Sequence, residues 1–84
     1  MDIKLTDQQK SELEKLWWIY GNNGPKCTLQ NHKLIQGFLH YNEDRREIYI
    51  QGNKNMKERF DKEYYEKHKL TDDCLEAVNK ILNS

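Results

Sequence analysis

Five side chains in this sequence are of the kinds that hold metal ions or act as nucleophiles: Cys27, His32, His40, His68 and Cys74. No two of them have the Cys-x-x-Cys or His-x-x-x-His spacing that presents two ligands on one local element. A Cys–His pair is formally available for nucleophilic catalysis, and Cys74 follows two aspartates in the first turn of a predicted helix. The helix dipole and these carboxylates act on a thiol in opposite directions. The pattern therefore favours cysteines that fill small apolar spaces in the core, and we expect no metal site, no cofactor and no enzymatic activity.

The segment Gly21–Gly24 reads GNNG and has the glycine spacing of a phosphate-binding loop. It lacks the Lys-Ser/Thr pair that follows a P-loop, and it lacks the basic residues of a KH-type loop. The segment before it has the character of an EF-hand entering helix, but no calcium loop with alternating carboxylates follows. A helix C-cap followed by a turn is the better interpretation.

Two adjacent tryptophans, Trp17 and Trp18, precede this loop. Adjacent side chains on a helix point about 100° apart, so the two rings do not share one core. Trp17 falls in a stripe with Leu13, Leu16 and Tyr20, which predicts that it is buried. Trp18 points away from that stripe and is predicted to be exposed, unless the helix is sandwiched between two elements that bury both rings.

The aromatic residues outside the predicted core stripes are the strongest functional signal. Tryptophan, tyrosine and arginine are the residue types that anchor protein interfaces. We therefore expect a partner-binding patch centred on Trp18. Its other candidate members are Tyr65, Arg45, Arg46, Tyr41 and Tyr49.

Composition sets the class of the protein. The chain has 84 residues, of which 36% are hydrophobic and 11% aromatic, and its 14 basic and 14 acidic residues cancel. These values predict one small folded domain over residues 1–84 and disfavour a dedicated nucleic-acid binder, which usually carries excess positive charge. Two cysteines, a charged start and the lack of a long apolar run favour a cytoplasmic protein that does not contact membranes.

The two ends of the chain are predicted to be helical. A helix over residues 6–20 begins at Thr6, with Gln9 at the capping-box spacing. A second helix over residues 54–68 carries an apolar stripe at four-residue intervals: Met56, Phe60, Tyr64 and His68. A third helix over residues 72–82 begins after Thr71 as its N-cap.

The middle of the chain, residues 27–51, is predicted to contain β-structure. The segment Arg46–Gly52, REIYIQG, alternates and is rich in β-formers, and Gly37–Tyr41 forms its hairpin partner across the polar loop Asn42–Arg45. Residues 27–36 fit either a third strand or a helix, because Leu34, Ile35, Phe38 and Leu39 also have helical spacing. The expected fold class is α+β, with an N-terminal helix, a hairpin or three-stranded meander, and two C-terminal helices.

These features lead to a functional hypothesis and an alternative. The chain is expected to be a small non-enzymatic protein-interaction module, a regulator or inhibitor of host or phage origin, that binds another protein through exposed aromatics. The alternative is a weak, winged-helix-like nucleic-acid binder that uses the hairpin tip at Arg45 and Arg46 and the segment Lys54–Lys62. A homodimer that closes over the same aromatics is a third possibility.

Overall fold

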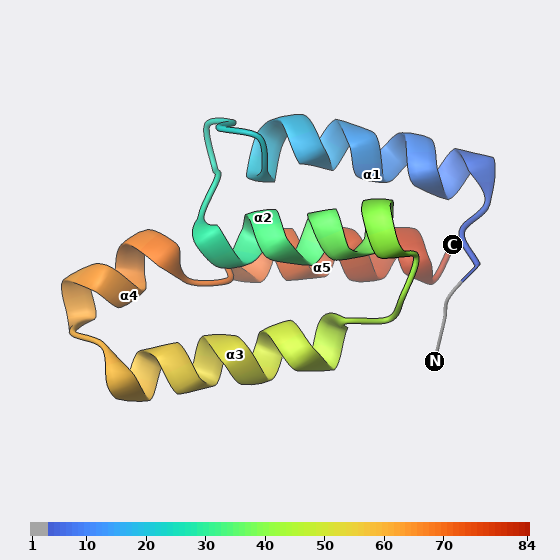
Figure 1. The fold of residues 1–84 in the computed structure, drawn as a ribbon. Helices are drawn as coiled ribbons and strands as arrows, with labels where there is room; N and C mark the ends of the chain where they lie inside the picture. Colours follow the sequence, from blue (N-terminus) through green and yellow to red (C-terminus); the bar gives the residue numbers. More distant parts are fainter. Residues whose placement is uncertain (1–3) are drawn as a thin grey trace.

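The computed structural model describes residues 4–84 and shows a bundle of helices (Figure 1). The helices are α1 (Asp7–Tyr20), α2 (Leu29–Gln36), α3 (Arg46–Arg59), α4 (Lys62–His68) and α5 (Asp72–Leu82), and a π-helical turn, η1 (Gly37–Tyr41), extends α2. Residues 4–84 contain no β-strand or sheet. The predicted α+β class, with its hairpin or meander over residues 27–51, is therefore wrong.

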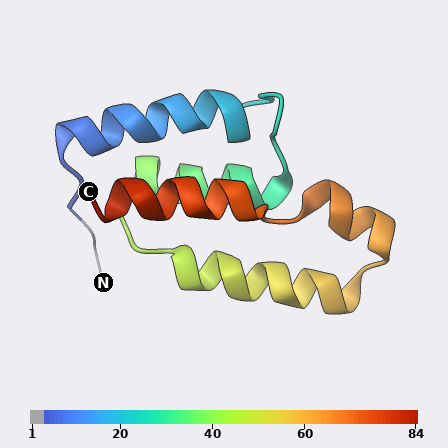
Figure 2. The same cartoon turned by 180° about the vertical axis from the view of Figure 1, so that it is seen from behind.

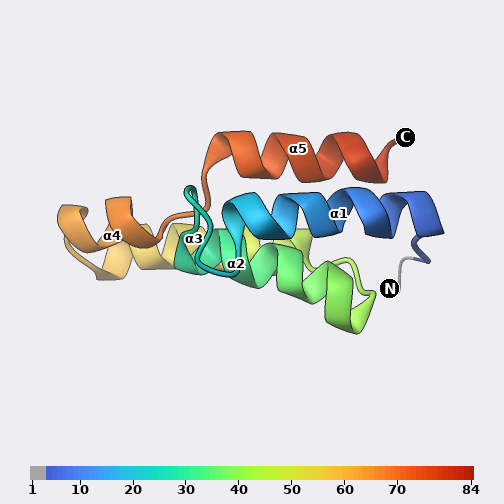
Figure 3. The ribbon, with the colours of Figure 1, turned by 90° about the horizontal axis from the view of Figure 1, so that it is seen from above.

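The hydrophobic core lies where α1, α2 with η1, and α5 meet. α1 runs antiparallel to both α2 and α5, and the views from the front, from behind and from above agree on this arrangement (Figures 1, 2 and 3). The buried side chains of this core are Leu13, Tyr20, Leu34, Ile35, Phe38, Leu70, Cys74, Val78 and Ile81. Burial of this apolar surface is the main force that stabilises so small a domain.

α3 and α4 lie on the other side of α2 and contribute less to the core (Figure 2). Met56 is the buried apolar residue of α3, and α4 has no buried residue. The two helices are therefore held largely by contacts at their ends and by α2.

The first helix and the turn after it were predicted correctly. Thr6 and Gln9 form the expected capping box, and Gly21 is the C-cap. Asn22 and Asn23 follow with φ angles of 44° and 62°, a left-handed conformation that asparagine tolerates well. At Gly24 a Cβ atom would lie 2.3 Å from the carbonyl oxygen of Trp18, so only glycine fits this close approach.

Helical spacing decided the conformation of residues 29–41. Leu34, Ile35 and Phe38 are fully buried on one face, and the Thr28 side chain caps α2 by accepting a hydrogen bond from the Asn31 amide. The helix runs on through Gly37 as η1 and ends at Asn42, which has a φ of 52°. The predicted strand Gly37–Tyr41 is therefore the last turn of a helix.

The predicted strand Arg46–Gly52 is the first half of α3. Its inward side chains are Tyr49, Gly52, Asn53 and Met56, which have helical spacing but are poorly hydrophobic as a set. The alternating isoleucines, Ile48 and Ile50, are exposed instead. β-Propensity is a weak preference that tertiary packing overrides, and here it gave the wrong element.

The predicted helix over residues 54–68 is two helices. α3 ends at Arg59, and Asp61 starts α4 by accepting a hydrogen bond from the Tyr64 amide at 2.7 Å. The break turns the expected apolar stripe outward, so that Phe60 is 49% exposed and Tyr64 is also exposed. The last predicted helix, residues 72–82, is confirmed as α5 with Thr71 as N-cap.

A fully buried asparagine, Asn31, connects three segments that are distant in sequence. Its Nδ2 donates to the Lys26 carbonyl at 3.2 Å and to the Thr71 hydroxyl at 3.0 Å. Its Oδ1 accepts a hydrogen bond from the Thr71 amide at 2.9 Å. The side chain therefore joins the loop after α1, the first turn of α2 and the start of α5.

Two further polar side chains hold the linker between α4 and α5. The Thr28 hydroxyl donates to the Lys69 carbonyl at 2.6 Å, and Asn53 Oδ1 accepts from the Leu70 amide at 2.7 Å. Together with Asn31 they pair three backbone groups of this linker: the Lys69 carbonyl, the Leu70 amide and the Thr71 amide. Burial of these groups without partners would destabilise the fold.

We expect Asn31→Ala to lower the free energy of unfolding by about 2–3 kcal/mol, because it leaves the partly buried Thr71 amide and Lys26 carbonyl without the partners that Asn31 supplies. Urea denaturation followed by far-ultraviolet circular dichroism measures this change. Asn55→Ala, at an exposed position whose side chain accepts a hydrogen bond from Gln51, is the matched control and should cost less than about 0.5 kcal/mol. Equal losses in the two variants would contradict the role given to Asn31.

Candidate functional site

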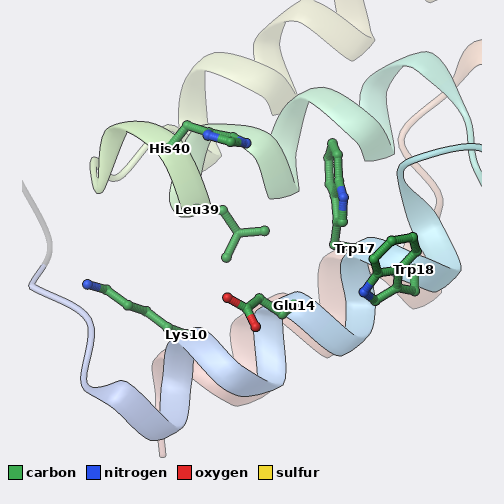
Figure 4. Close-up of a pocket in the computed structure, with 6 residues that line it drawn as sticks. All are labelled: Lys10, Glu14, Trp17, Trp18, Leu39 and His40. Carbon is green, nitrogen blue, oxygen red and sulfur yellow. The ribbon is translucent and has the colours of Figure 1, made fainter.

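An open groove between α1 and η1 brings both tryptophans to one surface (Figure 4). We call it the tryptophan groove; it has a volume of about 370 Å³ and is lined by Lys10, Glu14, Trp17, Trp18, Leu39 and His40. The side chains of α1 form one wall and those of η1 the other (Figure 4). A groove of this size accepts one large apolar side chain of a partner.

The two tryptophans have different surroundings, as the helical spacing predicted. Trp17 is half-buried and packs against the core, with its ring 4.8 Å from that of His32 and 6.3 Å from that of His40. Trp18 is 65% exposed. The alternative in which α1 is sandwiched and buries both rings is therefore wrong.

Tyr41 and Arg45 lie at the junction of η1 and α3. Tyr41 is 59% exposed, and the guanidinium of Arg45 lies over its ring, 4.9 Å from the centroid. Arg45 also forms an ion pair with Glu43. There is no hairpin tip among residues 4–84, so Arg45 does not have the position that the sequence analysis gave it.

Arg46 and Tyr49 are engaged within the fold. Arg46 contacts Asp44 at 3.4 Å and donates to Asn79 Oδ1 at 2.9 Å, which ties the start of α3 to α5. Tyr49 is half-buried and its ring packs closely over Gly37. These contacts stabilise the fold and leave the two side chains less available to a partner.

Tyr65 is also half-buried, because it faces α3. Its hydroxyl lies 3.4 Å from Asn53 Nδ2, and the ammonium of Lys57 lies 5.9 Å from its ring centroid. The six predicted patch residues thus occupy three separate places: α1, the η1–α3 junction and the α3–α4 contact. Of the six, the structure leaves Trp18 and Tyr41 well exposed.

A second groove, which the sequence analysis missed, lies between the start of α2 and α4. We call it the histidine groove; it has a volume of about 370 Å³ and is lined by Cys27, Thr28, Leu29, His32, Lys67 and His68. Beside it a ladder of rings runs along α4. Phe60 stacks on Tyr64 at 4.5 Å between centroids, and Tyr64 stacks on His68 at 4.2 Å.

The signal for this ladder was present in the sequence. Phe60, Tyr64 and His68 recur at four-residue intervals, which places them on one helix face. That face was assigned to the core because the sequence gives no strong signal that one helix ends before Asp61 and another begins after it. The aromatic repeat was therefore recognised, but it was wrongly predicted to face the core.

The two cysteines are unpaired and differ in environment. Cys74 is fully buried, and burial together with the nearby Asp73 raises the pKa of its thiol to about 12, so it stays protonated and poorly nucleophilic. Cys27 is half-buried, with its sulfur 3.8 Å from the Thr28 carbonyl oxygen. Within residues 4–84, histidine, cysteine and carboxylate side chains nowhere gather in the threes that would hold a metal ion.

Asp73 fixes the end of α1 that carries the tryptophans. It accepts hydrogen bonds from the Tyr20 hydroxyl at 3.2 Å and from the Lys26 ammonium at 3.3 Å. A hydrogen bond with Thr71, together with those from Lys26 and Tyr20, lowers the pKa of the carboxyl group to about 2. Burial and the carboxylate beside it raise the pKa of Tyr20.

Comparison with protein-family models, with curated protein sequences and with solved structures finds no match to this chain. None of the helices within residues 4–84 has both the length and the apolar character needed to cross a bilayer. What the chain binds must therefore be inferred from its own surface.

The contacts of Asp73 predict a pH-dependent loss of stability. Because its folded pKa of about 2 lies below the ordinary value of 3.8, the contribution is complete above about pH 5 and disappears as the pH falls towards 2. The carboxylate is half-exposed, so we expect Asp73→Asn to cost about 1 kcal/mol or less at neutral pH. Urea denaturation between pH 7 and about pH 2 should show the native protein and the variant converging in acid.

Asp72→Asn, at a neighbouring exposed position of the same turn, is the control for this measurement. If its stability difference from the native protein shrinks in acid as much as that of Asp73→Asn, the contacts with Tyr20 and Lys26 are not the cause.

The different exposure of the tryptophans predicts their accessibility to acrylamide. In Trp17→Phe the remaining Trp18 fluorescence should be quenched severalfold more efficiently than the Trp17 fluorescence of Trp18→Phe, because a half-buried ring meets the quencher less often. Stern–Volmer plots of the two variants give this ratio. Equal slopes would mean that the tryptophan groove does not have the described shape.

Proposed function

We propose that this chain is a small non-enzymatic protein-binding module whose partner docks in the tryptophan groove, with Trp18 as the anchor. The observation that carries the proposal is the 65% exposure of Trp18 on α1, beside the half-buried Trp17. A tryptophan ring contributes a large area to an interface at a small entropic cost, which is why tryptophan is enriched among interface hot spots.

The rest of the tryptophan groove supports the same role. Trp17 and Leu39 provide an apolar floor, whereas Lys10 and Glu14 provide a rim of opposite charges. An apolar centre with a polar rim is the usual anatomy of a protein interface. The bonds of Tyr20 to Asp73, at the end of α1, hold this surface in place before a partner arrives.

The winged-helix alternative has lost its geometric basis. The hairpin tip that was to carry Arg45 and Arg46 does not occur in residues 4–84. The segment Lys54–Lys62 is divided between α3 and α4, and carboxylates at Glu58 and Asp61 lie among its cations. We therefore do not propose nucleic acid as the ligand.

The test has two steps: the partner is identified by cross-linking, and its affinity is then measured. Glu14→p-benzoylphenylalanine places a photo-reactive side chain at the rim of the groove, where it captures a protein that docks there. That protein is then purified for binding measurements. Trp18→Ala should weaken its binding, measured by calorimetry, by at least about tenfold, because it removes the anchor. Its melting temperature should stay close to that of the native chain, since Trp18 is exposed.

Lys54→Ala, an exposed change on α3, is the control and should bind as tightly as the native chain. Unchanged affinity in Trp18→Ala would overturn the proposal. If the cross-linked protein is a second copy of the chain, and Trp18→Ala dissociates that dimer in sedimentation equilibrium, the partner is the chain itself and the groove is a homodimer interface.

A further inference from the structure

The histidine groove differs from other grooves of the surface in its charge. Its lining contains Lys67, His32 and His68 and no carboxylate. Four other grooves of 280–380 Å³ on the described surface each contain at least one: Glu14, Glu12, Glu66, and the pair Asp61 and Glu63. Lys67 and His68 also line the adjoining groove that contains Asp61 and Glu63, so the basic end of the histidine groove borders an acidic surface.

The groove also has an apolar part. Leu29 is 38% exposed, and it lines the groove together with Cys27 and Thr28. A ligand that fills this space must therefore offer apolar surface to Leu29 and negative charge to Lys67. An acidic peptide with a neighbouring apolar side chain meets both needs, whereas a free inorganic anion meets only the second.

One hydrogen bond determines which nitrogen of His68 is free for a ligand. Its Nδ1 lies 2.8 Å from the Tyr64 carbonyl oxygen, which can only accept, so Nδ1 carries the hydrogen of this bond. The other nitrogen, Nε2, is then a donor only when the imidazole is positively charged.

Charged and polar side chains surround His68. Lys67 and Glu63 lie on α4, Asp61 is the N-cap of that helix, and His32 and Cys27 lie across the groove. None of the residues that line these two grooves comes from α3. The ion pair between Lys67 and Glu63, 3.6 Å long, is exposed at both ends and holds the ammonium only weakly, so a ligand can compete for it.

The two grooves meet at one aromatic contact. Trp17 lines the tryptophan groove and His32 lines the histidine groove, and their ring centroids are 4.8 Å apart. The two grooves are therefore neighbours, separated by this pair of rings.

We propose that the partner is recognised through an acidic segment with an interspersed apolar residue, which docks in the histidine groove with its carboxylate on Lys67 and His68 and its apolar side chain on Leu29. This inference rests on the proposed function, because it names the chemistry of the partner that the tryptophan groove anchors.

The probe is a short peptide in which glutamate alternates with leucine, and its neutral twin has glutamine in place of glutamate. Nitrogen-15 spectra of the native chain should show shifts at the amides of residues 27–32 and 67–68 on addition of the acidic peptide at pH 6. We expect a dissociation constant of about 1 mM. Smaller shifts with the neutral twin are expected.

Charge-removing variants then locate the site. Lys67→Gln and His68→Gln should each weaken binding of the acidic peptide by roughly threefold to tenfold. Lys62→Gln removes the same positive charge at the exposed start of α4 and should leave the affinity for the acidic peptide unchanged. Equal binding of the two peptides to the native chain, or no shifts at residues 27–32, would overturn the proposal without relying on any variant.

The same titration separates this proposal from the proposed function. Trp18 lines only the tryptophan groove of the two, so Trp18→Ala should still bind the short acidic peptide. If the native chain does not bind the acidic peptide but its partner complex depends on Trp18, only the proposal for the histidine groove is refuted. If the chain binds the peptide but Trp18→Ala does not weaken the partner complex, only the proposal for the tryptophan groove is refuted.

Discussion

The arrangement of the helices depends on one buried polar side chain, that of Asn31. A fully buried amide destabilises the fold unless its hydrogen-bonding groups are paired, and here both ends of the amide are paired with groups from other segments. Apolar packing between α1, α2 and α5 tolerates small shifts of one helix along another. The hydrogen bonds of Asn31 do not, because they require the Thr71 backbone and the loop before α2 at fixed distances. They therefore set the register of the bundle.

That register also determines the two surface grooves. The linker of residues 69–71 is held by Thr28, Asn31 and Asn53, so α4, which buries no side chain of its own, is positioned by its C-terminal end. This placement brings Lys67 and His68 opposite Leu29 and His32. Asp73 accepts hydrogen bonds from Lys26 in the loop and from Tyr20, the last residue of α1, and so fixes the turn that carries Trp17 and Trp18. One polar network thus supports both candidate binding surfaces.

The sequence predicted those elements whose local chemistry and packing agree. Thr6 with Gln9 marks α1 and Thr71 marks α5, and both helices pack through clear apolar stripes. α3 was mistaken for a strand because its inward face is Tyr49, Gly52, Asn53 and Met56, a set too polar to reveal a helical period. Trp18 could be placed from the spacing of its neighbours. The histidine groove could not, because it joins residues 27–32 to residues 67–68 through the Asn31 network, which no local pattern encodes.

The neighbouring tryptophans show how a small domain divides apolar area between folding and recognition. Trp17 gives its surface to the core and to His32, and it contributes to stability. Trp18 keeps most of its surface in water, so it contributes little to stability while it adds a large hydrophobic side chain to the surface. A domain of this size has only a few kcal/mol of net stability. Rigid support by buried polar bonds then matters for binding as well, because a groove that is already ordered loses less entropy when a partner docks.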